Sequence, residues 1–140
     1  MFQWARCCAA AAIILAAAGC YRKPAAEAMS RGRYLVECVG MCADCHTPRD
    51  ARGEFDRARW LQGSTMESRP IRPVPGWAEK VPGIAGLPKL GDAAVIRLLE
   101  TGLRPDGKRP GPPMPQYRLS HEDAAAVADY LKSLPSAARE

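Results

Sequence analysis

The sequence lacks several features that would assign it to a common class. Its longest apolar run, which ends near Ala18, holds about a dozen residues, whereas a helix needs roughly 20 to cross a bilayer. The 20 Lys and Arg residues are scattered among 15 Asp and Glu, for a formal net charge of +5. This distribution does not favour a nucleic-acid interface, which is typically a basic stripe. With 140 residues, the chain has room for one domain and little more.

Residues 1–19 are typical of an export signal. Arg6 and the free amino terminus supply a short positive region, and the Ala-, Ile- and Leu-rich run follows it. We therefore expect this segment to direct the chain to the periplasm and to be removed there.

The end of the same segment resembles a bacterial lipobox. Small residues precede Cys20, although Ala17 stands where such motifs usually have Leu. We expect a lipid at Cys20 that anchors the protein to the membrane, followed by a polar tether over residues 20–29. Ordinary cleavage after Ala18, which would leave Cys20 as a spare thiol, is the alternative.

The motif that organises the chain lies at residues 42–46. Cys42 and Cys45 are three positions apart, and His46 follows the second cysteine. On a helical turn, residues at i, i+3 and i+4 share one face, so all three side chains can serve one planar group. The pattern CxxCH is that of c-type haem attachment, in which the thiols bind the vinyl groups and the imidazole binds the iron. The sequence therefore predicts one covalently bound haem c.

Other sites that use these residues fit less well. Together with Cys38, the two cysteines have the spacing of the ligands that hold an iron–sulfur cluster in radical enzymes that use S-adenosylmethionine. Such enzymes, however, need a large α/β barrel and a reducing cytoplasm. A zinc site usually divides its ligands between two separated pairs, and a thioredoxin-like pair would follow a strand that the sequence does not predict. A Cys42–Cys45 disulfide in a purely structural lipoprotein is a further hypothesis. We expect Cys38 itself to be a small buried residue.

Three stretches have the signals of helices. Residues 26–39 place Gly32 on an apolar face. A second helix is expected to begin with Asp92 as N-cap and to end at Gly102. The last helix is expected to begin with Ser120 as its cap. Tyr130 lies beside the apolar face of this helix, and we expect it to pack on the first helix near Gly32.

The segment between the motif and the second helix, residues 47–91, is predicted to have little regular structure because prolines interrupt it. A loop of this length in a compact domain is usually functional or folded over something, and a haem needs cover. Four residues are candidates for contacting the ring and its propionates, with a plain surface position as an equal alternative: Trp60, Arg69, Arg72 and Trp77.

A second candidate iron ligand lies in a loop of prolines and glycines. Met114 is bracketed by Pro113 and Pro115, which restrict the local backbone and can fix the direction of the thioether. A thioether opposite an imidazole favours the ferrous state. Met66 lacks flanking prolines and ranks below Met114. His121, the only other histidine, is expected to be solvated.

These features together resemble the class I monohaem cytochromes c over about residues 30–135, and we assign residues 30–140 to this domain. The resemblance implies an all-α, cytochrome c-like fold. Three to five helices would surround one haem, with the long Pro-rich loop between the haem motif and the second half. It also implies that electrons pass through an exposed haem edge.

The expected function is that of a one-electron carrier with His46 and Met114 as axial ligands, and not that of an enzyme. It would relay electrons between periplasmic or membrane redox partners, such as a dehydrogenase or a terminal oxidase or reductase. Nucleic acid is not an expected partner. The alternative is a haem protein with an open sixth position that senses a gas or reacts with peroxide. The sequence supplies no obvious polar distal groups for that chemistry.

Overall fold

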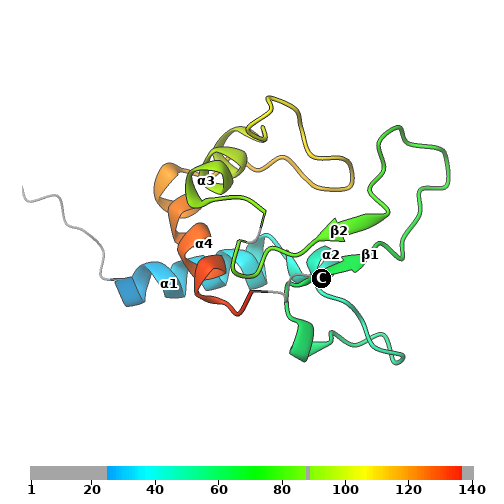
Figure 1. The fold of residues 1–140 in the computed structure, drawn as a ribbon, viewed down its shortest axis with the longest axis horizontal. Helices are drawn as coiled ribbons and strands as arrows, with labels where there is room; N and C mark the ends of the chain where they lie inside the picture. The colour runs from blue at the N-terminus through cyan, green and yellow to red at the C-terminus, as the bar shows by residue number, and fades with distance from the viewer. Residues whose placement is uncertain (1–24, 88, 137–140) are drawn as a thin grey trace, which may run out of the picture.

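The computed structural model describes residues 25–87 and 89–136. The expected export signal at residues 1–19 and the expected lipidation site Cys20 lie outside the described residues. The described part is mostly helical, as predicted, with one small ribbon of two strands (Figure 1). Its elements in chain order are α1 (Ala25–Tyr34), the π-helical turn η1 (Leu35–Val39), α2 (Ala43–His46), the 3-10 turn η2 (Arg57–Arg59), β1 (Gly63–Thr65), β2 (Lys80–Pro82), α3 (Asp92–Thr101) and α4 (His121–Ser133).

The first and last helices cross in direct contact, and a glycine makes this possible. Figure 1 shows α4 running across α1. Gly32 of α1 is buried, and a Cβ built on it would lie 2.0 Å from the carbonyl oxygen of Ala126 and 2.9 Å from Cβ of Tyr130. The hydroxyl of Tyr130 also donates to Glu37 Oε1 at 2.6 Å. The predicted packing of Tyr130 on the first helix near Gly32 is confirmed.

The first helix changes form before it reaches the haem motif. The expected helix over residues 26–39 is α-helical as far as Tyr34 and continues as the π-helical turn η1. A π turn closes its hydrogen bonds five residues apart rather than four, which rotates the following side chains relative to an α-helix. Cys38 lies in this turn and is exposed. The prediction that Cys38 is buried is therefore wrong.

The ends of the other two helices agree largely with their signals. Ser120 caps α4, since its hydroxyl accepts from the backbone N–H of Asp123. Gly102 ends α3 in the left-handed conformation, with φ of 73°. The N-cap of α3 is Gly91, not Asp92 as predicted, because Asp92 is already helical. Its carboxylate instead forms an ion pair with Lys132 of α4.

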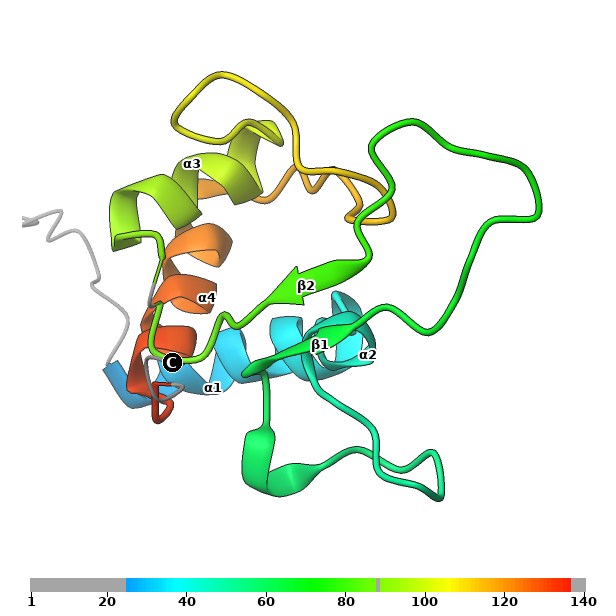
Figure 2. The same ribbon diagram turned by 45° about the vertical axis from the view of Figure 1, so that its right-hand side comes forward.

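The middle segment is irregular for most of its length, but it contains a two-stranded ribbon that the sequence did not predict. β1 pairs with β2 in antiparallel register, with Gly63 opposite Pro82. Figure 2 shows this ribbon beside α2, while the loop between the two strands reaches away from the helices. The ribbon therefore joins the haem motif to the second half of the chain.

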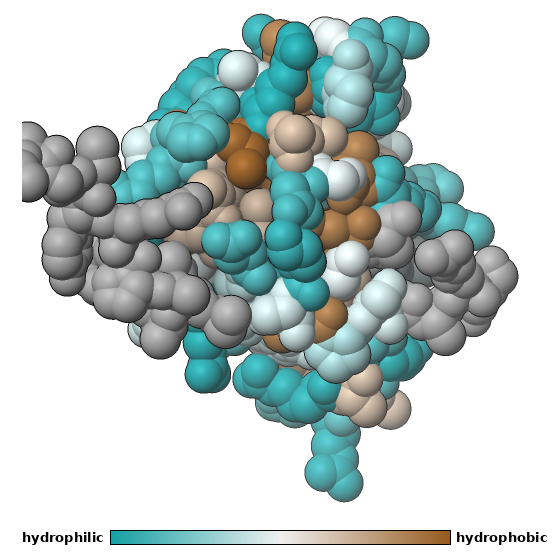
Figure 3. Space-filling model, turned by 60° about the vertical axis from the view of Figure 1, so that its left-hand side comes forward, coloured by the Kyte–Doolittle hydropathy of each residue, from teal (hydrophilic) through white to brown (hydrophobic). Residues whose placement is uncertain are grey.

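The core lies where α1, α3 and α4 meet, and the middle segment contributes to it. Leu61 has no exposed surface and belongs to the same apolar cluster as the helix residues Leu35, Val36, Val95, Leu99, Val127 and Leu131. On the face seen in Figure 3, hydrophobic residues reach the surface in patches between hydrophilic ones. Within the described part of the chain, none of the helices has the length and apolar character needed to cross a membrane.

We predict that Gly32→Ala lowers the free energy of unfolding by about 3 kcal/mol or more, because the new methyl group would displace the backbone of α4. Chemical denaturation followed by circular dichroism measures this change. Ser30→Ala, an exposed position of the same helix, is the matched control and should change stability by less than about 0.5 kcal/mol. Equal stability of the Gly32→Ala variant and the wild type would contradict the close contact.

Candidate haem site

One short helix presents the three residues of the motif. Cys42 is the N-cap of α2, and Cys45 and His46 are its last two residues. The backbone N–H of Cys42 donates to Val36 O at 3.0 Å and that of His46 donates to Cys42 O at 2.9 Å, so α2 is attached to η1. Met41, with φ of 46°, makes the turn between them. Both thiols are free, so the structure does not support the disulfide hypothesis.

The imidazole of His46 is buried and oriented by a backbone carbonyl. His46 is 7% exposed, and its Nδ1 lies 2.8 Å from Pro82 O. Burial lowers the pKa of His46, against an opposing effect of this hydrogen bond, so the neutral imidazole is favoured. When Nδ1–H donates to Pro82 O, Nε2 keeps its lone pair and is free to bind iron. Sequence reasoning did not identify Pro82, because a carbonyl acceptor 36 residues away carries no side-chain signature.

The ribbon that carries Pro82 is attached to α2 by a second contact. Pro82 is fixed by its register opposite Gly63. The next residue of β1, Ser64, donates its hydroxyl to Cys45 O at 2.5 Å. The two strands therefore each bond to one residue of the haem motif.

A buried hydroxyl next to the motif binds the segment that precedes β1. Thr47 is 2% exposed, and its Oγ1 accepts from the backbone N–H of Leu61 at 3.0 Å. The carbonyl of Leu61 in turn accepts from the N–H groups of Ile84 and Ala85. Leu61 thus joins the segment that enters β1 both to Thr47 and to the segment that leaves β2.

The thiol of Cys42 lies in apolar surroundings beside a tyrosine. Burial raises the pKa of Cys42 to about 11, and burial also raises the pKa of Tyr117 to about 12. The hydroxyl of Tyr117 donates to Gly40 O at 2.9 Å. At neutral pH both groups are therefore uncharged, which suits a site for an apolar plate rather than for a bare metal ion.

Two further observations fit a porphyrin with acidic substituents. Cys42 lies in a shallow apolar groove whose other lining residues are Leu35, Val36, Val39, Gly40, Leu99, Tyr117, Leu119 and Val127. The indole Nε1 of Trp77 is buried without a hydrogen-bond partner. A buried donor of this kind normally has an acceptor, and a propionate carboxylate would supply one. The free thiols, the oriented imidazole and the groove fit a haem, and the Trp77 donor is a candidate partner for one of its propionates.

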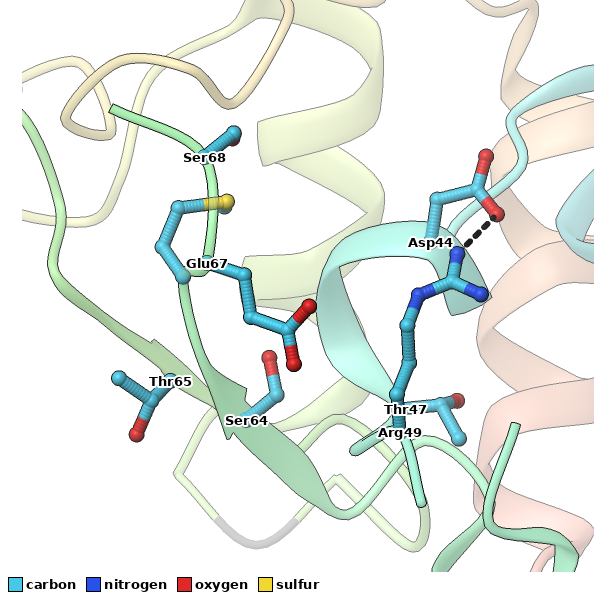
Figure 4. A pocket seen from close by; sticks show the side chains of 8 residues that line it. Asp44, Thr47, Arg49, Ser64, Thr65, Glu67 and Ser68 are labelled. Carbon is cyan, nitrogen blue, oxygen red and sulfur yellow. Dashed lines mark ion pairs between the residues drawn. The ribbon is translucent and has the colours of Figure 1, made fainter. Parts of the chain in front are cut away.

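A second cavity of about 220 Å³ has a different character. Figure 4 shows Asp44 and Arg49 on one side of it, joined as an ion pair, and Glu67 on the other. Charged and hydroxyl groups dominate its lining, and Met66 is also part of it. Its charged side chains distinguish this cavity from the apolar groove beside Cys42. In the described part of the chain, no cluster of three His, Cys, Asp or Glu residues is placed to hold a metal ion.

The remaining candidates lie in four different settings. Met114 is half-buried in the loop between α3 and α4. His121 is exposed, with Nδ1 2.7 Å from Glu100 Oε1, as expected for a solvated residue. Trp60 packs edge to face on Phe55 at 5.8 Å between ring centres. Arg69 and Arg72 are both exposed on the loop between β1 and β2.

Comparison with known proteins bears on the family of the chain. The sequence profile of the cytochrome c family matches residues 30–135. A diheme cytochrome c-type protein of Cereibacter sphaeroides is 37% identical over 113 residues, which are 76% of this chain and 35% of that protein.

Two further relatives are subunits of dehydrogenases. The fructose dehydrogenase cytochrome subunit of Gluconobacter japonicus is 30% identical over 120 residues, 78% of this chain and 22% of that protein. The gluconate 2-dehydrogenase cytochrome c subunit of Pantoea cypripedii is 32% identical over 129 residues, 80% of this chain and 28% of that protein. The chain therefore spans about a third or less of each of these relatives.

We predict that Thr47→Val destabilises the domain by about 1–3 kcal/mol, because it leaves the N–H of the fully buried Leu61 without an acceptor. Thr65→Val is the matched control, since Thr65 is exposed in β1, and it should change stability by no more than about 0.5 kcal/mol. Denaturation curves of the two variants provide the comparison. A Thr47→Val variant as stable as the control would show that the hydrogen bond to Leu61 contributes nothing.

Proposed function

The chain belongs to the cytochrome c family, and we propose on this basis that it carries single electrons by means of one haem c held by Cys42, Cys45 and His46. When bound, the haem supplies an iron that alternates between the ferrous and ferric states. The observation that carries the proposal is the hydrogen bond from the buried His46 to Pro82 O, which leaves Nε2 available beside two free thiols. The printed sequence contains the CxxCH motif once, which supports a single haem.

We propose Met114 as the second axial ligand. Met114 is half-buried and has a proline on either side in the sequence, in a loop that contacts the middle segment close to β2. Met66 is the competing methionine, but it lines the polar cavity with Asp44 and Glu67. With a soft thioether and a neutral imidazole as its two ligands, the haem iron would have a higher reduction potential than with two imidazoles. Its sixth coordination position would also be closed to outside ligands.

The proposed partners are other redox proteins, with a dehydrogenase as the electron donor. Two of the relatives are cytochrome subunits of dehydrogenases, which supports a role as an electron-transfer component and not as the catalytic one. A net charge of +5 favours encounter with acidic protein surfaces.

We also propose that the domain works in the periplasm at a membrane surface, held by a lipid on Cys20. The support for this proposal is the apolar run followed by small residues and a cysteine. Covalent haem attachment also takes place outside the bacterial cytoplasm, which fits export. A single acyl group binds membranes weakly, so a stable anchor needs more than one chain.

We predict that Met114→Ala abolishes the ligand-sensitive absorption feature of the oxidised protein and lowers its reduction potential, because the iron loses its thioether. The ferrous variant should also bind carbon monoxide rapidly. Intact mass, visible spectra and a potentiometric titration of protein purified from a periplasm competent in haem attachment provide the measurements.

Met66→Ala is the matched control for this experiment and should keep the spectrum and potential of the wild type. If Met66→Ala instead removes the ligand-sensitive absorption feature, Met66 rather than Met114 is the second axial ligand. Rapid carbon monoxide binding by the wild type would favour the alternative of an open sixth position. A colourless mature polypeptide whose mass matches the chain without haem would overturn the proposal as a whole.

We predict that Cys20→Ser releases the haem protein from the membrane fraction into the soluble periplasm and removes the mass of the lipid. Fractionation with detection of covalent haem, together with mass spectrometry, measures both effects. Cys38→Ser, which changes an exposed thiol of the described domain, should leave the distribution unaltered. Membrane association that persists in Cys20→Ser would mean that Cys20 is not the anchor.

A further inference from the structure

The loop that carries Met114 depends on another part of the chain for its position. Residues 103–116 form no helix or strand, and the five prolines among them lack a backbone N–H. The other hydrogen bonds of this loop are local turns. Among the described residues, one hydrogen bond joins the loop to a segment distant in sequence, in which the N–H of Ala78 donates to Pro112 O at 2.7 Å.

The same two segments also touch backbone to backbone. A Cβ built on Gly111 would lie 2.5 Å from Gly76 O and 3.9 Å from Cβ of Ala78. The first distance is shorter than any real Cβ contact, so only glycine at position 111 allows the approach. Gly76 itself has φ of 75°, a conformation that favours glycine. Both sides of the contact therefore require a residue without a side chain.

The segment that receives the loop leads directly into β2. Glu79 O accepts from the N–H of Met66 at 2.8 Å, which closes the base of the loop between the strands. β2 then ends at Pro82, whose carbonyl orients His46. Ala78 and Pro82 are four residues apart, and four extended residues span no more than about 14 Å. One short stretch therefore contacts both the imidazole and the loop that carries the thioether.

We propose that residues 76–82 act as a strut that positions both axial ligands. Pro82 O orients His46 on one side, and Ala78 N–H, with the Gly76–Gly111 contact, holds the Met114 loop on the other. Gly111 and Ala78 are then positioning residues. The inference rests on the proposed ligation by Met114. A loop held in place before it binds loses less entropy when it does so, and this keeps the thioether at the iron against competing ligands.

The test is Gly111→Ala in the holoprotein. Its methyl group should displace Gly76 O and break the hydrogen bond to Ala78. The oxidised spectrum and the reduction potential should move from the wild-type values toward those of Met114→Ala. The affinity for added imidazole, which competes with the thioether, should rise roughly tenfold, the size of effect expected for one lost hydrogen bond with local strain.

Gly91→Ala is the matched control, because a Cβ at Gly91 meets no atom within 4 Å. Gly91 is the N-cap of α3, so this substitution can lower stability but should leave the spectrum, potential and imidazole affinity unchanged. Intact mass shows whether each variant carries covalent haem.

Amide hydrogen exchange supplies a measurement that does not depend on the haem spectrum. The N–H of Ala78 should be protected in the wild type and in Met114→Ala, and should exchange faster in Gly111→Ala. The N–H of Leu61, which donates to Thr47, reports on the rest of the domain and should exchange equally in all of them.

Two results would overturn the strut. The first is a Gly111→Ala variant with wild-type spectrum and potential, while Met114→Ala differs from wild type. The second is an Ala78 amide that exchanges in the wild type as fast as an unprotected one, which decides the question even if Gly111→Ala does not fold. A failure of the proposed ligation by Met114 would give a different result from a failure of the strut. In that case Met114→Ala itself would have the spectrum and potential of the wild type.

Discussion

The hydrogen bond between His46 Nδ1 and Pro82 O is the interaction on which the site depends. A free imidazole can offer either nitrogen to a metal and can rotate about its side-chain bonds. The carbonyl removes both freedoms, because it accepts a hydrogen bond from Nδ1–H, which fixes the proton on that nitrogen, and because this bond sets the plane of the ring. Burial adds to this effect by keeping the ring neutral. The short ribbon of β1 and β2 supplies that carbonyl, and so a very small sheet controls the chemistry of a helical domain.

The parts of the structure that could be predicted from sequence are those with local signals. The CxxCH spacing places Cys42, Cys45 and His46 on one turn whatever surrounds it. Ser120 and Gly102 mark the ends of helices because their effects act on the adjacent turn of backbone. The packing of Tyr130 against Gly32 could also be predicted, since a glycine inside a helix requires a close neighbour.

The parts that could not be predicted depend on backbone contacts between distant segments. Each strand of the ribbon has three residues, too few for an alternating pattern, and Pro82 argued against a central strand. Cys38 was misplaced because a π turn cannot be recognised from apolar periodicity, and such a turn changes which side chains face the core. Asp92 has the residue type of a cap, but its carboxylate pairs with Lys132 instead. In each case a partner elsewhere in the fold decided the outcome.

The haem motif alone does not distinguish an electron carrier from a sensor, because both need the covalent bonds and the imidazole. The difference lies at the sixth position. A sensor needs a site that opens to an outside ligand, whereas a carrier needs the same ligands in both oxidation states, so that little must rearrange when an electron moves. The Met114 loop has no regular structure of its own, and its prolines reduce the number of conformations that its backbone can adopt in the unfolded chain. Whether the proposed thioether ligand would stay in place therefore depends on what the loop is attached to. The backbone contact with residues 76–78 supplies that attachment, and in this protein it favours the carrier.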